Sequence, residues 1–365
     1  KHIEGGISLM TRSLIFSAPM VSTGYGIAGS YFYKNLVQQG IDVSCFPVQI
    51  DNTFFTNKEI DDIYLSRNRY TIEQPFLKIF HPLELSLRIG KGKYFGFPFF
   101  ETDHFSDLEK KNLEYCDTVI TSSHWAKQII EDKIKHQNVK VIPLGVDTNI
   151  FDYSKYKKPE NSKYIFCTIG KWEVRKCHDI LLSIFERAFS KDDDVELWVC
   201  ASVPNAYNDM EEVKKWEAVY SSHKLSSKIK VIPHQATHLD IAKLISLTDC
   251  GLYPSRAEGW NLELLETMAM NKPVIVSNYS AHTEFCNKDN AYLVDIDNLV
   301  PAHDGKFFQG QANWAEIGTK QIDQIVEYMR YLYKNNIRSN KNGVLTGQKF
   351  SWSNATKKLV DSVYE

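Results

Sequence analysis

Residues 250–277 read CGLYPSRAEGWNLELLETMAMNKPVIVS, and this stretch decides the fold that we expect. The apolar run CGLYP predicts a strand, LELLETMAM predicts a helix that ends at NKP, and PVIVS predicts another strand. A strand, a helix and a strand in this order predict parallel strands joined by a crossover helix. The polar turn SRAEGWN joins the first strand to the helix.

The same alternation extends along the chain in both directions and lapses once, in the polar, lysine-rich residues 151–162. We therefore predict an α/β chain of two doubly wound, Rossmann-like domains, at 10–152 and 160–345, which face each other across a cleft. The predicted strands span 13–18, 42–48, 76–81, 92–100, 117–123 and 139–145 before the linker, and 164–170, 195–201, 229–234, 250–255 and 273–277 after it.

Composition limits the classes of protein that the chain can belong to. With 365 residues, 43% of them hydrophobic, it is long enough for two domains that each bury a core. The formal net charge of −2 argues against a protein that coats nucleic acid by bulk electrostatics. A local basic strip at Arg88, Lys91 and Lys93 is compatible with either a binding surface or a solvated loop.

Cysteine usage and hydropathy favour a cytoplasmic protein. The seven cysteines are scattered without a Cys-x-x-Cys pair, which predicts neither a zinc site nor a disulfide framework. No apolar run approaches the roughly 18 residues of a membrane-spanning helix. We expect Met10 to be the natural start, with residues 1–9 an extension.

In open α/β sheets, ligands bind beyond the carboxyl ends of the strands, so the loops after strands are informative. The first such loop, STGYGIAG, places Gly24, Gly26 and Gly29 in a Gly-x-Gly-x-x-Gly pattern before a helix. This pattern lets backbone amides approach a phosphate. It fits a dinucleotide site with Asp51 on the ribose, a tight turn without a ligand, or a loop near a nucleotide-sugar phosphate.

A second loop, GKWEVRKCHD, follows the strand at 164–170 and carries Lys171, Arg175 and Lys176. Cations at the edge of a cleft can neutralise a diphosphate as it departs. The alternative is a solvated loop in which Asp179 caps the next helix.

The third loop is the turn SRAEGWN, with Glu258 before the helix and Glu266 inside it. On an ideal helix a spacing of eight residues returns to within about 80° of the starting face, so both carboxylates can face one cleft. A buried Glu266 needs hydroxyl or amide partners, which a ribose diol supplies. The alternative is an exposed Glu266 and a capping Glu258. Amides at the helix start favour an anion; they belong to Gly259, Trp260, Asn261 and Leu262.

Together these segments resemble the family-4 retaining glycosyltransferases of GT-B fold, whose signature is Glu-x7-Glu. SSHWAKQII and VKVIPLGVDTNIF resemble the end of their N-terminal domain, and FFQGQANWAEI and FSWSNATKKLVDSVYE resemble their C-terminal segments. The resemblance runs from about Leu14 to the end of the chain. It implies that the last helix, at about 350–365, crosses back to the first domain.

The resemblance implies roles for the donor residues. Glu258 would hold hydroxyls of the donor sugar and Glu266 those of the ribose. Lys171 and Lys176 would bind the diphosphate, with Arg175 beside them. Donor contacts are further implied for Gly24, Gly26, Gly259, Trp260, Asn261 and Leu262.

Some members of that family use a histidine of the N-terminal domain near the reacting sugar. At the corresponding place this chain has FFETDHF, which makes Glu101 the candidate, with Asp103 and His104 behind it. His81, in IFHPLE, is another candidate for the acceptor side. The stretch 49–70 forms either an acceptor wall or a surface insertion.

The chain departs from the family pattern at three positions. Asn261 and Cys177 stand where glycine is usual, and Glu263 stands where proline is usual. The extra carboxylate near the sugar could alter the choice of donor.

The resemblance implies transfer of a sugar from a UDP- or GDP-linked donor to an acceptor hydroxyl, with retention, by a front-face mechanism. No metal or further cofactor is expected, and KDDD at 191–194 is predicted to be a turn. A glycan, a lipid-linked glycan, a protein or a modified nucleic-acid base could be the acceptor. Two alternatives are an NAD(P)-dependent oxidoreductase that uses the Gly24 loop, and a binding module without turnover.

Overall fold

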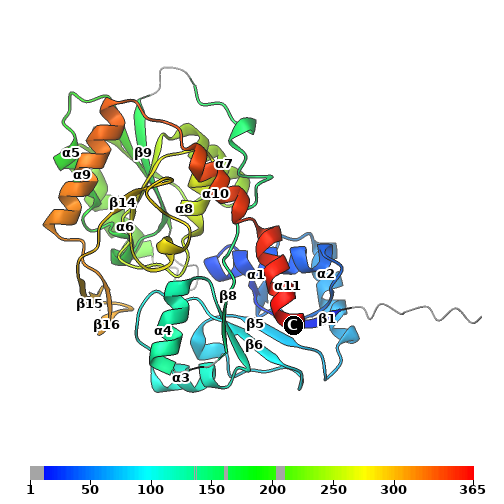
Figure 1. Cartoon of the computed structure of the whole chain (residues 1–365). Coiled ribbons are helices and arrows are strands. Elements are labelled where there is room, and N and C mark those ends of the chain that lie inside the picture. Colours follow the sequence, from blue (N-terminus) through cyan, green and yellow to red (C-terminus); the bar gives the residue numbers. More distant parts are fainter. Residues whose placement is uncertain (1–11, 135, 137, 160–162, 203–209) are drawn as a thin grey trace, which may run out of the picture.

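The computed structural model describes residues 12–134, 136, 138–159, 163–202 and 210–365. They form two lobes, each built on a six-stranded parallel sheet with helices on both faces (Figure 1). The predicted start at Met10 and the predicted domain limits at 10 and 160 lie outside the described residues.

The sheet of the first lobe has its first strand in an interior position, so the chain reverses direction across the sheet between β1 and β5. In sheet order its strands are β3 (Asp42–Cys45), β1 (Ser13–Ser17), β5 (Phe76–Ile79), β6 (Tyr94–Phe97), β7 (Thr118–Thr121) and β8 (Val139–Val141). Its helices are α1 (Gly24–Gln38), α2 (Asn57–Ser66), α3 (Asp107–Glu114) and α4 (His124–Ile134). The short strands β2 (Pro19–Met20) and β4 (Gln49–Ile50) pair beside it.

The sheet of the second lobe has the doubly wound strand order of dinucleotide-binding folds, with the reversal between β9 and β12. In sheet order its strands are β11 (Ile229–Ile232), β10 (Val195–Ser202), β9 (Tyr164–Lys171), β12 (Cys250–Tyr253), β13 (Val274–Ser277) and β14 (Tyr292–Val294). Its helices are α5 (Leu181–Ala188), α6 (Met210–Ser221), α7 (His238–Leu247), α8 (Leu262–Ala269), α9 (Thr319–Lys334) and α10 (Lys341–Lys349). The prediction of two Rossmann-like parallel sheets is confirmed.

Alternating residues of a strand point to opposite faces of its sheet, and both faces of these sheets are buried. In β1, Leu14 and Phe16 belong to one buried apolar cluster while Ile15 belongs to another. Continuous apolar strands such as SLIFS therefore follow from helices that cover both faces.

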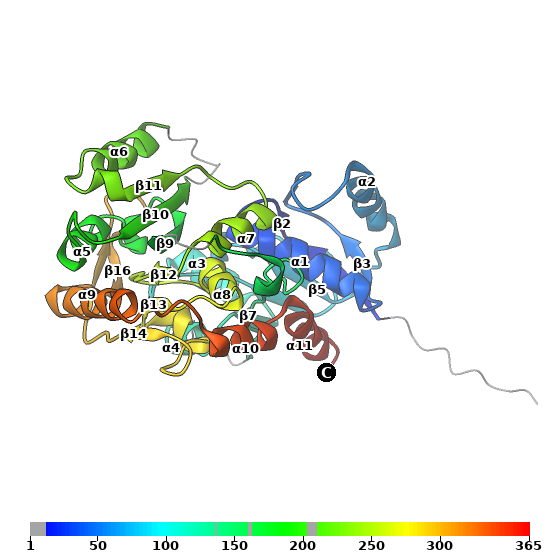
Figure 2. The same ribbon diagram turned by 90° about the horizontal axis from the view of Figure 1, so that it is seen from above.

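The last helix, α11 (Trp352–Tyr364), packs against α1 of the first lobe. Figure 2 shows α9, α10 and α11 following one another along one side of the molecule, from the second lobe to the first. The ring of Trp352 stacks on Tyr31 at 5.1 Å with an interplanar angle of 3°. The Tyr364 hydroxyl donates to the carbonyl oxygen of Ser13 at 2.7 Å. These contacts fasten the C-terminal helix to β1 and α1.

A β-hairpin of β15 (Leu299–His303) and β16 (Gln309–Ala315) was not predicted as strands. It packs on the second lobe through a small apolar cluster that includes Ala257, Ala302 and Trp314. Helices α2, α3, α9 and α10 were also missed. Residues 191–194 form a turn before β10, as predicted.

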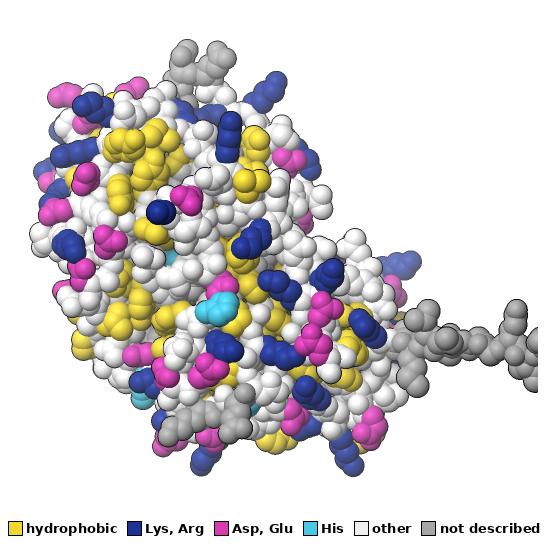
Figure 3. Space-filling model, in the orientation of Figure 1, with side chains coloured by type: hydrophobic (Ala, Val, Ile, Leu, Met, Phe, Trp, Pro, Cys, Tyr) yellow, Lys and Arg dark blue, Asp and Glu magenta, His cyan; other side chains and the backbone are white. Residues whose placement is uncertain are grey.

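The surface is of mixed charge. Figure 3 shows basic and acidic side chains interspersed over one face. In the candidate basic strip, Arg88 donates to the carbonyl oxygens of Lys91 at 3.1 Å and Gly92 at 2.6 Å, so it is tied into its own loop. Lys91 and Lys93 are exposed, which favours the solvated loop.

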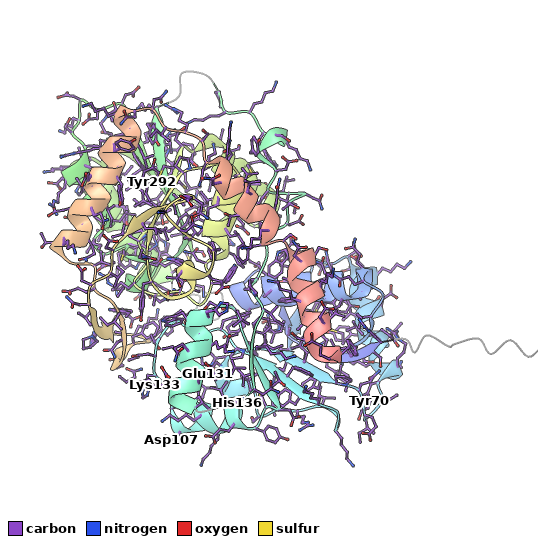
Figure 4. All side chains as sticks on the ribbon, in the orientation of Figure 1. Tyr70, Asp107, Glu131, Lys133, His136 and Tyr292 are labelled. Carbon is purple, nitrogen blue, oxygen red and sulfur yellow. The ribbon has the colours of Figure 1, made fainter. Side chains whose placement is uncertain are left out.

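The stretch 49–70 contains β4, α2 and a short 3-10 turn at Arg67–Arg69. Figure 4 places Tyr70, where the stretch ends, at the outer margin of the first lobe. All seven cysteines are buried free thiols. Among the described residues, no helix has the length and apolar character needed to cross a bilayer.

We expect Trp352→Ala to lower the free energy of unfolding by about 3–5 kcal/mol, because it deletes a ring that is only 3% exposed between α1 and α11. Urea unfolding followed by circular dichroism measures the loss. Leu345→Ala, at a side chain that is 61% exposed, is the control and should change stability by less than about 0.5 kcal/mol. A loss for Trp352→Ala no larger than for the control would show that this contact contributes little.

Candidate functional site

A cleft between the lobes receives side chains from both of them. It lies where the loops that follow β2, β4 and β6 of the first lobe meet the carboxyl end of β10 and the loops that follow β9, β11 and β12 of the second. The first lobe supplies Ser22, Thr23, Gly24, Tyr25, Thr53, Phe54, Phe99 and Glu101. From the second lobe come Lys171, Arg175, Lys176, residues 234–238, residues 258–263 and Glu266.

Glu258 is the centre of the charge network in this cleft and is 4% exposed. Its Oε1 lies 3.0 Å from Nζ of Lys176, and its Oε2 lies 2.7 Å from a terminal guanidinium nitrogen of Arg175. Burial alone raises the pKa of Glu258, but Arg175 and Lys176 outweigh burial and hold that pKa well below its usual range. Glu258 is therefore an anion near neutral pH.

Lys176 reaches Glu258 because the backbone at Gly170 has no side chain. A Cβ built on Gly170 would lie 2.6 Å from Cδ of Lys176, so any other residue here would displace the Lys176 side chain. Burial lowers the pKa of Lys176, but the carboxylates of Glu258, Glu263 and Glu173 together outweigh burial and the pKa is raised. Lys171 lines the same cleft, and no described residue forms a hydrogen bond or ion pair with its ammonium group.

Helix α8 begins in this cleft at Asn261, whose φ of 81° lies in the left-handed region. Its Oδ1 accepts from the amide of Leu264 at 3.2 Å, and its Nδ2 lies 2.9 Å from Nε2 of His282. The other ring nitrogen of His282 lies 3.0 Å from the carbonyl oxygen of Ser277, an acceptor only. Burial lowers the pKa of His282 to about 4, so the neutral ring accepts from Asn261 and donates to Ser277.

Two of the three departures from the family pattern now have a backbone explanation. Cys177 has φ 64° and Asn261 has φ 81°, which is the region where glycine is favoured. The chain forms a left-handed backbone at both positions without glycine, and the side chain at each position makes a hydrogen bond that glycine could not make. The Cys177 thiol donates to the carbonyl oxygen of Pro254 at 2.9 Å, while Asn261 caps α8.

Glu266 lies one turn further along α8 and lines the cleft, with 5% of its surface exposed. Burial raises its pKa well above the usual range, and the carboxylates of Glu263 and Asp147 raise it further. Nε2 of His238 lies 4.0 Å from Oε1 of Glu266. Because burial lowers the pKa of His238 to about 4, this ring is neutral at pH 7 and the contact is not ionic.

An aromatic and polar cluster joins the lobes beside Glu266. The Tyr31 hydroxyl of α1 lies 3.1 Å from Nδ1 of His238 on α7 and 3.2 Å from Oδ2 of Asp147. The rings of Phe54 and Phe151 pack edge-on against His238, each at 5.6 Å. The middle of α1 thus helps to position the Glu266 side of the cleft.

A second set of contacts joins the lobes near Glu258. The Ser122 hydroxyl donates to the carbonyl oxygen of Gly259 at 2.6 Å. The carboxylate of Asp103 accepts from the backbone amide of Asn313 on the hairpin at 2.8 Å and from its side chain at 3.1 Å. The loop at 259 is therefore held against the first lobe.

The predicted acceptor residues lie apart from the cleft lining, except Glu101. Asp103 bonds the hairpin, His104 is exposed, and His81 caps the 3-10 turn at Pro82–Glu84 by accepting from the amide of Leu83 at 3.3 Å. Among the described side chains of the segment FFETDHF, Phe99 and Glu101 line the cleft.

The glycines of the Gly-x-Gly-x-x-Gly pattern have different surroundings: one lines the cleft, and another packs closely against the backbone. Gly24 lines the cleft, whereas a Cβ on Gly26 would lie 2.1 Å from the carbonyl oxygen of Val21. Thr23 caps α1 by accepting from the amide of Gly26 at 3.2 Å. Only the first glycine of the pattern is therefore placed to approach a ligand.

Sequence reasoning missed the part of the lining at 234–238. Residues 234–238 follow β11, so the rule that loops after parallel strands line the ligand site could have included them. Thr53 and Phe54 belong to the stretch 49–70, for which the sequence left open an acceptor wall or a surface insertion, and these two residues of it line the cleft.

Known proteins resemble this chain in sequence over about half of its length. Residues 163–303 match the family model described as Glycosyl transferases group 1. The O-antigen chain mannosyltransferase RfbU of Salmonella typhimurium is 24% identical over 200 residues, 55% of this chain and 53% of that protein. The MMP alpha-(1->4)-mannosyltransferase of Mycolicibacterium hassiacum is 24% identical over 205 residues, 54% of this chain and 46% of that protein. The chain spans about half the length of these relatives.

Solved structures match over nearly the whole chain. Sucrose-phosphate synthase of Thermosynechococcus elongatus superposes with a TM-score of 0.70 at 14% identity, over 96% of this chain and 98% of that one. HepE of Anabaena, in complex with UDP and glucose, superposes with a TM-score of 0.68 at 12% identity, over 96% and 99%. The fold is GT-B, and residues 163–303 are similar in sequence to the glycosyl transferases of group 1.

We expect Glu266→Gln to raise the melting temperature of the ligand-free protein at pH 7 by roughly 2–4 °C. The pKa of Glu266 is higher in the folded chain than in the unfolded chain, so stability is lost as pH rises through the unfolded value. The gain should shrink towards about pH 4, where the carboxyl is protonated in both states. Thermal unfolding at several pH values measures it.

Glu258→Gln is the matched control, because the pKa of Glu258 is shifted in the opposite direction. Its folded pKa is lowered, so its stabilisation is present at pH 7 and is lost as pH falls through that value. Glu258→Gln should therefore lower the melting temperature at pH 7. Destabilisation of the protein by both substitutions at pH 7 would contradict the account of Glu266.

Proposed function

We propose that the protein is a retaining glycosyltransferase that moves a sugar from a nucleoside diphosphate sugar to an acceptor hydroxyl. One observation carries the proposal. Two buried side chains line one inter-lobe cleft beside a helix N-terminus: Glu258, an anionic carboxylate held by cations, and Glu266, a carboxyl with no cationic partner among the described residues. This arrangement offers acceptors for hydroxyls and positive charge for a diphosphate.

The donor would lie along the start of α8. Glu266 would accept hydrogen bonds from the ribose diol, which satisfies a group without a cationic partner among the described residues. Glu258 would hold hydroxyls of the sugar. Lys171, Lys176 and the amides at 259–262 would stabilise the diphosphate, which gains charge as its bond to the sugar breaks.

The reaction would proceed on one face of the sugar. The acceptor oxygen bonds to the anomeric carbon as the bond from that carbon to the phosphate oxygen breaks, and the departing oxygen takes the acceptor proton. The anomeric configuration is then retained. Because the chain's own cations meet the diphosphate charge, we expect no need for a divalent metal.

Glu101 is the first-lobe carboxylate of the cleft, so we propose that it acts on the acceptor side. Residues 10–152 with the last helix would bind the acceptor, and 160–345 would bind the donor. The named mannosyltransferase relatives make glycans the first acceptors to test. We favour this function over a dinucleotide oxidoreductase because the buried carboxylates and cations that line the cleft, Glu258, Glu266, Lys171 and Lys176, come from the second lobe and not from the Gly24 loop.

The first experiment is transfer from UDP-glucose and GDP-mannose, with and without EDTA, to a panel of glycosides. We expect turnover with one of these donors, an α-linked product by NMR, and a rate that EDTA leaves unchanged. A β-linked product would overturn retention, and full inhibition by EDTA that Mg²⁺ reverses would overturn metal independence. If a wider donor panel gives neither binding nor hydrolysis, the proposed function is wrong.

We expect Lys171→Ala and Lys176→Ala each to lower kcat/KM by about 10²–10³-fold, because each removes a cation from the departing diphosphate. Initial rates at varied donor concentration measure the effect. Lys171→Ala should leave the melting temperature nearly unchanged, since no described residue pairs with Lys171, while Lys176→Ala also strips a partner from Glu258. Rates within about twofold of wild type would contradict these roles.

A further inference from the structure

Arg175 lines the cleft beside Lys171 and Lys176, but protein groups already occupy most of its guanidinium. Its Nε and one terminal nitrogen donate to Oε2 of Glu173, at 3.0 and 2.6 Å. The other terminal nitrogen donates to Oε2 of Glu258 at 2.7 Å and to the carbonyl oxygen of Ala257 at 2.7 Å. These four bonds use four of the five N–H donors of an arginine.

Arg256 also links the loop after β12 to the loop after β9, through its backbone amide and its side chain. The amide of Arg256 donates to the carbonyl oxygen of Arg175 at 2.8 Å. The Arg256 guanidinium makes two bonds of 2.9 Å to the carboxylate of Asp179, two residues beyond Cys177. The loop after β9 and the loop after β12 are therefore joined by backbone and side-chain bonds at Arg256, Ala257 and Glu258.

Arg175 is nearly inaccessible, with 5% of its surface exposed, and it lies between two carboxylates. Burial would raise the pKa of Glu173, yet the charges of Arg175, Lys171 and Lys176 together outweigh burial and lower it. Lys171 differs, since its ammonium group is unpaired within the described ranges. A ligand for a diphosphate needs free donors, which Lys171 has and Arg175 largely lacks.

We propose that Arg175 is a positioning residue that fixes the Glu258 carboxylate for the donor sugar, rather than a ligand of the diphosphate. Glu173, which is not among the residues that line the cleft, would act through Arg175 by holding the guanidinium plane. The inference rests on the proposed function and assigns a task within it. It divides the three cations of the loop into two that meet the phosphates and one that orients the carboxylate.

The experiment compares nucleoside diphosphate binding with sugar recognition in Arg175→Lys, Arg175→Met and Glu173→Gln. The probes are UDP and GDP by calorimetry, and UDP-glucose and GDP-mannose in steady-state kinetics. For both Arg175 variants we expect the Kd of the preferred nucleoside diphosphate to stay within about threefold of wild type. We expect kcat/KM for the sugar donor to fall about 30-fold or more, as when a partner of a buried charge pair is removed.

Glu173→Gln should likewise leave the Kd of the nucleoside diphosphate within about threefold of wild type. It should lower kcat/KM for the sugar donor by a smaller factor than the Arg175 variants do. A surface arginine of the same lobe, Arg187, pairs with Asp323, so Arg187→Met is the matched control and should change neither quantity. Near-ultraviolet circular dichroism and nucleotide binding identify any variant that fails to fold. Glu173→Gln keeps the inference testable if the Arg175 variants fail, because its uncharged amide preserves the shape of the side chain.

A tenfold or greater loss of nucleoside diphosphate affinity in folded Arg175 variants would make Arg175 a phosphate ligand and overturn the inference. So would wild-type kcat/KM in those variants, or in Glu173→Gln if it is the only variant that folds. If the wild-type protein bound neither the nucleoside diphosphates nor their sugars, the proposed function itself would fail, which separates the two results.

Discussion

The arrangement of the cleft depends on keeping one carboxylate charged inside the protein. A buried carboxylate without compensating charge is costly, so Glu258 requires cations at contact distance. Lys176 and Arg175 supply them from the loop after β9, while Glu258 comes from the loop after β12. These strands are neighbours at the point where the chain reverses across the sheet, so the topology itself brings the opposite charges together.

The same region carries several unfavourable features. Cys177 and Asn261 have left-handed backbones, each at a cost of about 1–3 kcal/mol, and Glu266 is buried without a cation among the described residues. The neutral ring of His282 holds Asn261, and the hairpin supports the loop at 256–258 from outside. The surrounding packing thus stabilises the first turns of α8, where the amides at 259–262 and the carboxyl group of Glu266 line the cleft.

Much of this could be predicted from the sequence, because strands and helices alternate with clear periodicity and the charged loops directly follow strands. Long-range pairings could not be predicted. Asp103 bonds Asn313 and Tyr31 meets His238, and each pair is separated by more than 200 residues without a local signal. The hairpin was missed because Pro301 lies inside β15, where a proline argues against a strand.

The chain passes between the lobes twice, and the two passages run side by side. Val146 and Ser351 form a parallel bridge, and the amide of Val146 donates to the carbonyl oxygen of Phe350 at 2.9 Å. Two adjacent connections constrain twisting and stretching between the lobes more than one connection would. Because Val146 and Phe350 share a hydrogen bond, a displacement of one connection is passed directly to the other.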